Sequence, residues 1–331
     1  GGAVQLIVLL TPLHKRRQLP KLRWEPGHPG SQRIARLMVP ALFGFSIAQI
    51  STLVDRMLAS FLPEGSISFL YYANRLLQFP LGIFGIALSI AIFPALAAHA
   101  AKEESGEFLE ILGAGLRLVL FVCLPAAVGL AILASPIIQV LFERGAFTAA
   151  DTAMTAKAVL AYAAGLVAYA GVKIVVSAFY SLQDTRTPVK IAALVLAANV
   201  VLNVILMVPL KHAGLALAGA LCAFLNVGLL LRALHRRLGG LGGRAIARSF
   251  YRILPPTALM AVIVYGAKQH LYAPAGSVVG RVSALATCLL LGAAVYLLAA
   301  KVTGCQELSL LRESLRSRQA GKALPPDLTP E

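Results

Sequence analysis

Charged residues are scarce in this sequence. Asp, Glu, Lys and Arg make up 13% of its 331 residues, whereas soluble domains contain about a quarter. Hydrophobic residues reach 58%, and the mean hydropathy is +0.79. A soluble protein of this size with so few charged residues could not cover its surface with them. The shortage therefore excludes a soluble fold and indicates that most of the surface faces lipid.

Acidic residues are rarer than basic ones, with 14 Asp and Glu against 30 Lys and Arg, and the net charge is +16. Such a charge could indicate nucleic-acid binding. The basic residues, however, concentrate in one alternating set of loops between apolar stretches and in the C-terminal tail. This alternation is the positive-inside pattern of membrane proteins, so we expect no nucleic-acid partner.

Acid clusters and metal-ligand spacings are also missing. The sequence has no DxxD-type cluster, with which a membrane enzyme such as a polyprenyl-phosphate transferase would hold metal and phosphate. Its four cysteines form no CxxC pair, and Cys123, Cys222 and Cys288 fall in apolar stretches. We therefore expect no enzymatic activity, no metal site and no cofactor.

Eight apolar stretches are long enough to cross a bilayer, which takes about 20 residues of helix. Lipid offers no partners for backbone N–H and C=O groups, so each stretch is expected to be helical. Prolines within them, among them Pro80 and Pro94, predict kinks. The predicted fold class is an all-α integral membrane protein. Its spans are expected at residues 37–61, 69–98, 111–142, 158–181, 189–209, 214–231, 253–272 and 282–300.

The segments between the spans predict four regions. Residues 1–36 combine the end of a truncated transmembrane helix with a basic cytoplasmic connector, because the apolar run Gly1–Leu10 is too short to span a bilayer. Residues 37–238 hold six spans. Residues 239–303 begin with a glycine-rich basic stretch and hold two additional spans. Residues 304–331 are expected to form a cytoplasmic tail that is partly disordered.

Ionisable residues inside a span cost roughly 2.5–3.5 kcal/mol each, so their presence needs a reason. Arg75 is either an interfacial arginine beside Tyr71 and Tyr72, or a cavity arginine whose planar guanidinium binds a phosphate bidentately. Asp55 and Arg56 are either a local pair near the outer interface, or one of them faces a polar cavity shared with Arg75. Adjacent helix positions point about 100° apart, so both are not expected to face the same way.

Two asparagines interrupt an otherwise aliphatic span. Asn199 and Asn203 are four residues apart and should share one helix face. They are interpreted either as hydrogen-bonding contacts between helices or as part of an ion or substrate site. In the loop that precedes this span, Thr187 is expected to be the N-cap of the next helix, with Pro188 at its first position.

Four motifs in order resemble one family, the MurJ/MviN lipid II flippases, over roughly residues 30–240. They are YYANRLLQFPLGIFG (Tyr71–Gly85), LFERGAF (Leu141–Phe147), FYSLQDTRTPVK (Phe179–Lys190) and KHAGLALA (Lys211–Ala218). The resemblance implies a fold of the multidrug/oligosaccharidyl-lipid/polysaccharide exporter class, in which two six-helix lobes face a central cavity. Two extra C-terminal helices would form a groove for the lipid tail. The chain would then contain one multi-helix transporter lobe plus these two helices.

The resemblance also implies a function. The chain would belong to a transporter that flips lipid II, an undecaprenyl-pyrophosphate-linked saccharide, by alternating access across the bacterial cytoplasmic (inner) membrane. Its partners would be lipid II, membrane lipids and a missing N-terminal lobe of the same protein. Two alternatives stay open: export of another lipid-linked saccharide, and an inactive fragment that lacks the N-terminal lobe.

Site residues follow from the resemblance one by one. Arg75 would bind the substrate's pyrophosphate, and Asn74 stands where relatives often have Asp. Some members have a sodium site whose positions match Asp55, Asn199, Asn203 and Gly219 here. Asn203 replaces an acid and Gly219 replaces a threonine, which removes a charge and a hydroxyl ligand. We therefore expect transport by this protein to be independent of sodium.

Overall fold

The computed structural model describes residue 10 and residues 29–240, 243–273, 276–305 and 307–308. Among these residues there are helices and no strands, which confirms the all-α prediction. The predictions for residues 1–28 and for the tail beyond Leu308 lie outside the described residues. The helices are α2 (Pro29–Ser60), α3 (Ser66–Pro80), the π-helical η1 (Leu81–Ile86), α4 (Ala87–Ala101), α5 (Ser105–Ile132), α6 (Ala134–Phe142), α7 (Ala149–Ala164), α8 (Leu166–Ser181), α9 (Arg186–Leu210), α10 (His212–Leu238), α11 (Gly243–Leu271) and α12 (Val278–Val302).

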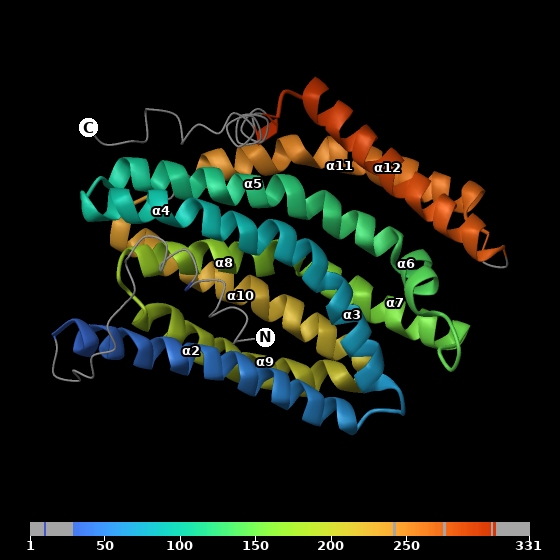
Figure 1. Ribbon diagram of the computed structural model, residues 1–331, viewed down its shortest axis with the longest axis horizontal. Helices are drawn as coiled ribbons and strands as arrows, with labels where there is room; N and C mark the ends of the chain where they lie inside the picture. The colour runs from blue at the N-terminus through green and yellow to red at the C-terminus, as the bar shows by residue number, and fades with distance from the viewer. Residues whose placement is uncertain (1–9, 11–28, 241–242, 274–275, 306, 309–331) are drawn as a thin grey trace. The chain divides into compact units, whose positions relative to one another are not determined.

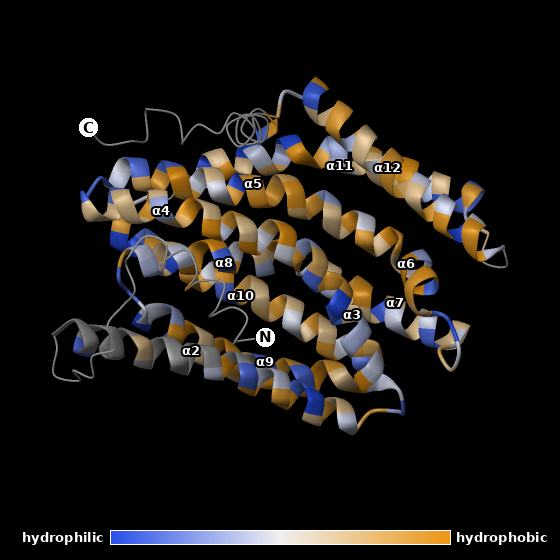
Figure 2. Cartoon of the chain, in the orientation of Figure 1, coloured by the Kyte–Doolittle hydropathy of each residue, from blue (hydrophilic) through white to orange (hydrophobic). Residues whose placement is uncertain are grey.

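Most predicted spans are present as long apolar helices. Within the described residues six helices are long and apolar enough to cross a membrane, or seven if the bent pair α7–α8 counts as one span. Figure 2 shows apolar residues along most of α5 and α12, with hydrophilic residues near the helix ends. The predicted span 37–61 lies within α2. That helix begins at Pro29, so residues 29–36 of the predicted connector are helical instead.

Two of the predicted spans are interrupted, and one more changes its helical form while it stays continuous. The second changes from α-helix to π-helix after Pro80, which has no N–H to donate within the helix. The third is divided at Leu133 into α5 and α6. The fourth bends by 44° at Gly165, where a Cβ would lie 2.8 Å from the Cα of Ala220 in α10. Only a residue without a side chain permits this approach between α7–α8 and α10.

Contacts divide the chain into two units, Gly1–Leu42 and Phe43–Glu331. In the second unit the breaks separate two apolar cores. The outer core is named for Ala59, at the end of α2 that is farthest from the basic connector predicted to be cytoplasmic. It contains residues of α2, α3, α6, α7 and the start of α10. The inner core contains residues of η1, α4, α5, α8 and the end of α10. Figure 1 shows α3, α6 and α7 near one end of this unit and α4 and α8 near the other.

A third core joins the last two helices to α5. It includes Phe121 of α5, Ile253 of α11 and Tyr296 of α12. The Tyr296 hydroxyl donates a hydrogen bond of 2.6 Å to the carbonyl oxygen of Phe121, and the Lys268 ammonium donates one of 2.9 Å to that of Ile132. The helices of residues 239–303 therefore pack in the same unit as the lobe that precedes them.

The turn before α9 is capped by Asp184. Its carboxylate accepts hydrogen bonds from the N–H groups of Arg186 (3.1 Å) and Thr187 (3.0 Å). The expectation that Thr187 is the N-cap was wrong, because α9 begins at Arg186 and the Thr187 hydroxyl donates to Asp184 at 2.7 Å. Partial burial alone would raise the pKa of Asp184, but these hydrogen bonds and the charge of Arg237 hold it below its ordinary value.

Replacing Asp184 with Ala is expected to lower the free energy of unfolding by about 1 kcal/mol, as for other lost caps. The lowered pKa means that this stabilisation is complete above the ordinary aspartate pKa of 3.8 and is lost as the pH falls through the folded value. Thermal unfolding in detergent at several pH values measures both effects. Asp184→Asn keeps an acceptor oxygen and serves as the matched control. An unchanged melting temperature for Asp184→Ala would contradict the capping role.

Candidate functional site

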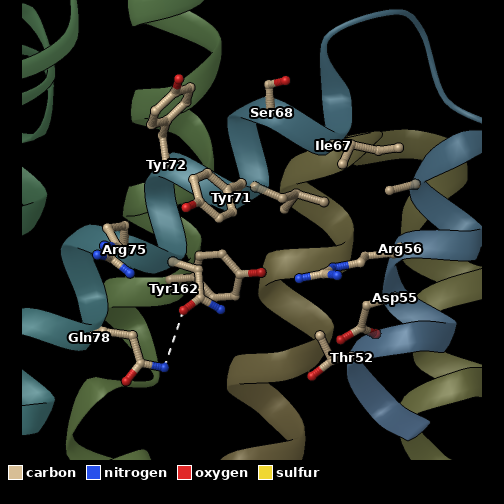
Figure 3. Close-up of a pocket in the computed structure, with 13 residues that line it drawn as sticks. Thr52, Asp55, Arg56, Ile67, Ser68, Tyr71, Tyr72, Arg75, Gln78 and Tyr162 are labelled. Atoms are coloured by element: carbon tan, nitrogen blue, oxygen red, sulfur yellow. Dashed lines mark hydrogen bonds between the residues drawn. The ribbon is translucent and has the colours of Figure 1, made fainter. Parts of the chain in front are cut away.

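A polar cavity of about 670 Å³ lies between α2 and α3 and reaches α7. Asp55 and Arg56 of α2 line it together with Arg75 of α3 and Tyr162 of α7, as Figure 3 shows. The structure thus brings together residues that are far apart in the sequence. Both Asp55 and Arg56 border the cavity, whereas the sequence analysis expected one of them to do so. The cavity is wide enough to contact two adjacent positions of α2 whose side chains point in different directions.

One face of α3 supplies most of the polar wall. Ser68, Tyr72, Arg75 and Gln78 are spaced by three or four residues, so they lie along one side of the helix. The opposite side is apolar and buried in the cores. The sequence analysis assigned no role to Ser68, Gln78 or Tyr162, although the helical spacing of polar residues within an apolar span was a visible signal for the first two.

Two arginines give the cavity its positive charge. Figure 3 shows Arg56 and Arg75 approaching from opposite sides, with Tyr162 between them. In the part of the chain that the structure describes, neither guanidinium makes an ion pair. Arg75 therefore lines a cavity wall, as the second sequence interpretation expected. Two planar guanidinium groups that face one cavity are suited to an anion with several oxygens, such as a diphosphate.

Asn74 leaves the charge of Arg75 uncompensated. Its side-chain oxygen accepts a hydrogen bond of 3.3 Å from Gln78, one turn further along α3. Both side chains line the cavity. A carboxylate at position 74 would place a negative charge beside Arg75, whereas the amide adds none. The cavity wall of α3 is therefore cationic, with neutral polar groups on either side of the guanidinium.

Asp55 is tied to α9 through the two asparagines. The Asn203 amide nitrogen donates to the Asp55 carboxylate at 2.7 Å and to the Asn199 side-chain oxygen at 3.0 Å. Asn203 is fully buried and Asn199 is nearly so. The expected shared face and the expected contact between helices are both present. Neither asparagine lines the cavity, so Asp55 is the member of this hydrogen-bonded cluster that also lines the cavity.

The residues at the positions of the family's sodium site form a hydrogen-bonded cluster that offers a sodium ion little charge. Asn203 directs both amide hydrogens toward the oxygens of Asp55 and Asn199 that would otherwise ligate a cation. Gly219 supplies no ligand oxygen, and a Cβ there would lie 2.9 Å from the Tyr169 hydroxyl. The donor nitrogen of Asn203 thus lies between the two oxygens. Asp55 is the one carboxylate at these positions, and the Asn203 oxygen, which is buried without a hydrogen-bond partner among the described residues, is a neutral ligand only.

Sodium is therefore expected to leave the melting temperature of the protein unchanged relative to potassium at equal ionic strength. Asn203→Asp, which replaces the donor nitrogen with a second carboxylate, is expected to introduce a sodium-dependent rise. Thermal unfolding in detergent with each salt measures both. A rise caused by sodium in the unaltered protein would show that the three side chains rearrange around the ion.

Comparison with known proteins places this geometry in a family. A family model described as lipid II flippase MurJ matches residues 1–301. A probable lipid II flippase MurJ of Vibrio cholerae is 44% identical over 235 residues, which cover 71% of this chain and 45% of the relative. One of Bdellovibrio bacteriovorus is 35% identical over 314 residues, which cover 95% of this chain and 60% of the relative. The chain therefore spans about half the length of the curated relatives it matches.

Solved structures show the same fold. A lipid II flippase MurJ in an inward closed conformation is similar with a TM-score of 0.68 and 25% identity, and the match covers 86% of this chain and 57% of that one. An outward-facing multidrug resistance transporter of the MATE family in the MOP superfamily is similar with a TM-score of 0.55 and 16% identity, over 84% of this chain and 66% of that one. The second likeness concerns the fold alone, and that fold agrees with the one expected from the sequence.

Proposed function

Because the chain belongs to the MurJ family of lipid II flippases, we propose that it is part of a transporter that moves lipid II across the bacterial cytoplasmic membrane by alternating access. The observation that carries the proposal is the pair of arginines, Arg56 and Arg75, without ion-pair partners among the described residues, in a cavity of about 670 Å³. The surrounding chain is a multi-pass membrane protein. Charges within a membrane span are costly, and those that are kept pair with one another or face a polar cavity, where they mark a substrate or ion pathway.

The cavity would act by replacing water around an anionic headgroup. A diphosphate loses its hydration when it enters a low-dielectric slab, and guanidinium groups fixed in the protein offset that loss. Arg75 would bind the diphosphate bidentately, with Asn74 and Gln78 as neutral polar groups beside it. The polyprenyl tail would stay in lipid. No covalent step is needed, so we propose a transporter without enzymatic activity and without a nucleic-acid partner.

The contacts of Asp55 support a positioning role. Its hydrogen bond to Asn203 joins α2 to α9, and α9 packs along α10. Arg56, the next residue of α2, lines the cavity. We propose that the Asp55–Asn203–Asn199 cluster holds this part of α2 in place, so that the cavity keeps its second arginine.

Alternating access is one bundle moving against another around a shared site. The matches cover 45% of one relative's length and 54% of another's, so we propose that this chain works together with the part of their length that it does not match. The test uses cells depleted of their own flippase. Growth is expected when this chain is expressed with the unmatched part of the Vibrio cholerae relative as a separate chain, and not with either alone. Failure of the pair to restore growth, with both chains present in the membrane, would overturn the proposed function.

A further inference from the structure

A second cavity, of about 630 Å³, lies toward the outer end of α3. Its walls are aromatic: the ring centroids of Tyr72 and Phe142 are 4.7 Å apart, and those of Tyr72 and Phe147 are 5.4 Å apart with their planes perpendicular. Phe69 completes the wall. Tyr72, Phe142 and Phe147 are partly exposed, so their ring surfaces are available within the cavity. The LFERGAF motif, which the first cavity does not use, provides much of this wall.

The two cavities adjoin each other. Ser68 and Tyr72 line both, and they share a face of α3 with Arg75. Seven residues of helix separate Ser68 from Arg75, which corresponds to about 10 Å along the axis. Tyr72 is three residues from Arg75, so the aromatic cavity begins about one helical turn outward from the arginine that we place on the diphosphate and extends past Ser68. A ligand that extends beyond its diphosphate would enter it.

Arg144 is the cation of the second cavity. It is exposed and makes no ion pair among the residues that the structure describes. Its neighbour Glu143 is engaged elsewhere, because it accepts a hydrogen bond of 2.7 Å from the Thr152 hydroxyl.

The acid of this cavity, Asp151, is also engaged. It accepts hydrogen bonds of 2.7 Å from the N–H and the hydroxyl of Thr148, as part of the cap of α7. Arg144 is therefore left available for a ligand.

We propose that this cavity binds the saccharide headgroup of the lipid-linked diphosphate. Aromatic rings offer flat apolar surfaces to the C–H faces of sugar rings, and Arg144 offers a planar fork of donors to the oxygens of the headgroup. A bare polyprenyl diphosphate would occupy the first cavity and leave the second empty. The inference rests on the proposed function, because it takes the diphosphate at Arg75 as its starting point.

The test compares two lipids, lipid II and undecaprenyl pyrophosphate, which share tail and diphosphate but differ in the headgroup. Their Kd values are measured by titration of the purified chain in detergent. Arg144→Gln is expected to weaken lipid II binding about tenfold, the effect of one lost charged hydrogen bond, and to leave undecaprenyl pyrophosphate binding unchanged. Lys157→Gln, at an exposed cation of α7 that lines neither cavity, should change neither.

A second variant tests the aromatic wall. Phe147→Leu keeps an apolar side chain but removes the flat ring, and it should weaken lipid II binding selectively as well. Arg75→Ala should weaken the binding of both lipids, since both carry the diphosphate. If it weakens neither while Arg144→Gln acts on lipid II, the diphosphate assignment fails and the headgroup assignment holds.

Three results would overturn the inference. An equal effect of Arg144→Gln on both lipids would place the diphosphate or the tail in the second cavity. No effect on either lipid would show that the headgroup lies elsewhere. Undetectable binding of both lipids to the unaltered chain, also after it is assembled with the unmatched part of the Vibrio cholerae relative, would overturn the proposed function, and this inference with it.

Discussion

Replacing Arg75 with Ala abolishes lipid II flipping by the assembled transporter while its level in the membrane stays normal: this is the result expected if the guanidinium binds the diphosphate. Loss of one partner from a charged hydrogen bond that the bound ligand buries costs about 3 kcal/mol, which corresponds to a decrease in transport on the order of a hundredfold. Arg75 is exposed within the cavity, so its removal should leave the cores intact. Flipping in vesicles, with protein amounts matched by immunoblot, measures the change.

Two further variants define the role of the side chain. Arg75→Lys keeps the charge but loses the fork, so it should restore transport only in part. Arg232→Ala removes an exposed arginine of α10 that lines neither cavity, and it should transport normally. Normal transport by a well-expressed Arg75→Ala protein would remove this residue from the diphosphate site.

Gly214→Ala is expected to prevent stable folding. A Cβ at this position would lie 2.1 Å from the carbonyl oxygen of Leu206 and 2.5 Å from its carbon, and both are backbone atoms that a rotamer change leaves in place. The close approach occurs where α9 turns into α10. The overlap should cost at least about 3 kcal/mol, in the range of severe overpacking. Yield after purification and the melting temperature in detergent measure the loss.

Gly228→Ala is the matched control on the same helix. No atom lies within 4 Å of a Cβ there, so the substitution should be neutral or should stabilise α10 by up to about 1 kcal/mol. Equal melting temperatures for the two variants would show that the α9–α10 turn adapts. A shift of the α9–α10 turn would also move the end of α9. Asn203 lies seven residues, about two turns, before Leu210, so its hydrogen bond to Asp55 would weaken.

Hydropathy was sufficient to predict most of the fold, because the bilayer requires long apolar helices wherever the chain crosses it. The breaks inside the spans were harder. Pro80 predicted the first one, since proline removes a backbone donor. Leu133 gave no signal for the second. The bend at Gly165 depends on the close approach of this residue to Ala220. The two residues are far apart in the sequence, so no local sequence pattern could predict the bend.

The sequence predicted those site residues whose presence inside an apolar span is energetically costly. Arg75 and Asp55 stood out because charges within a span need a reason, and both line the cavity. Tyr162 did not stand out, because an isolated tyrosine in an apolar helix is ordinary and its place opposite α3 is decided by packing. The cap of α9 was missed for a chemical reason: two candidate caps were close together, and the stronger, charged acceptor of Asp184 took the free N–H groups.

The stacking of the outer and inner cores has a consequence for how the bilayer acts on this protein. The outer core contains residues of α3 and α7, the helices whose side chains also line the cavity, whereas the inner core contains residues of α4 and α8. A change in lipid packing around the outer ends of the helices would therefore act first on the core that holds the cavity walls.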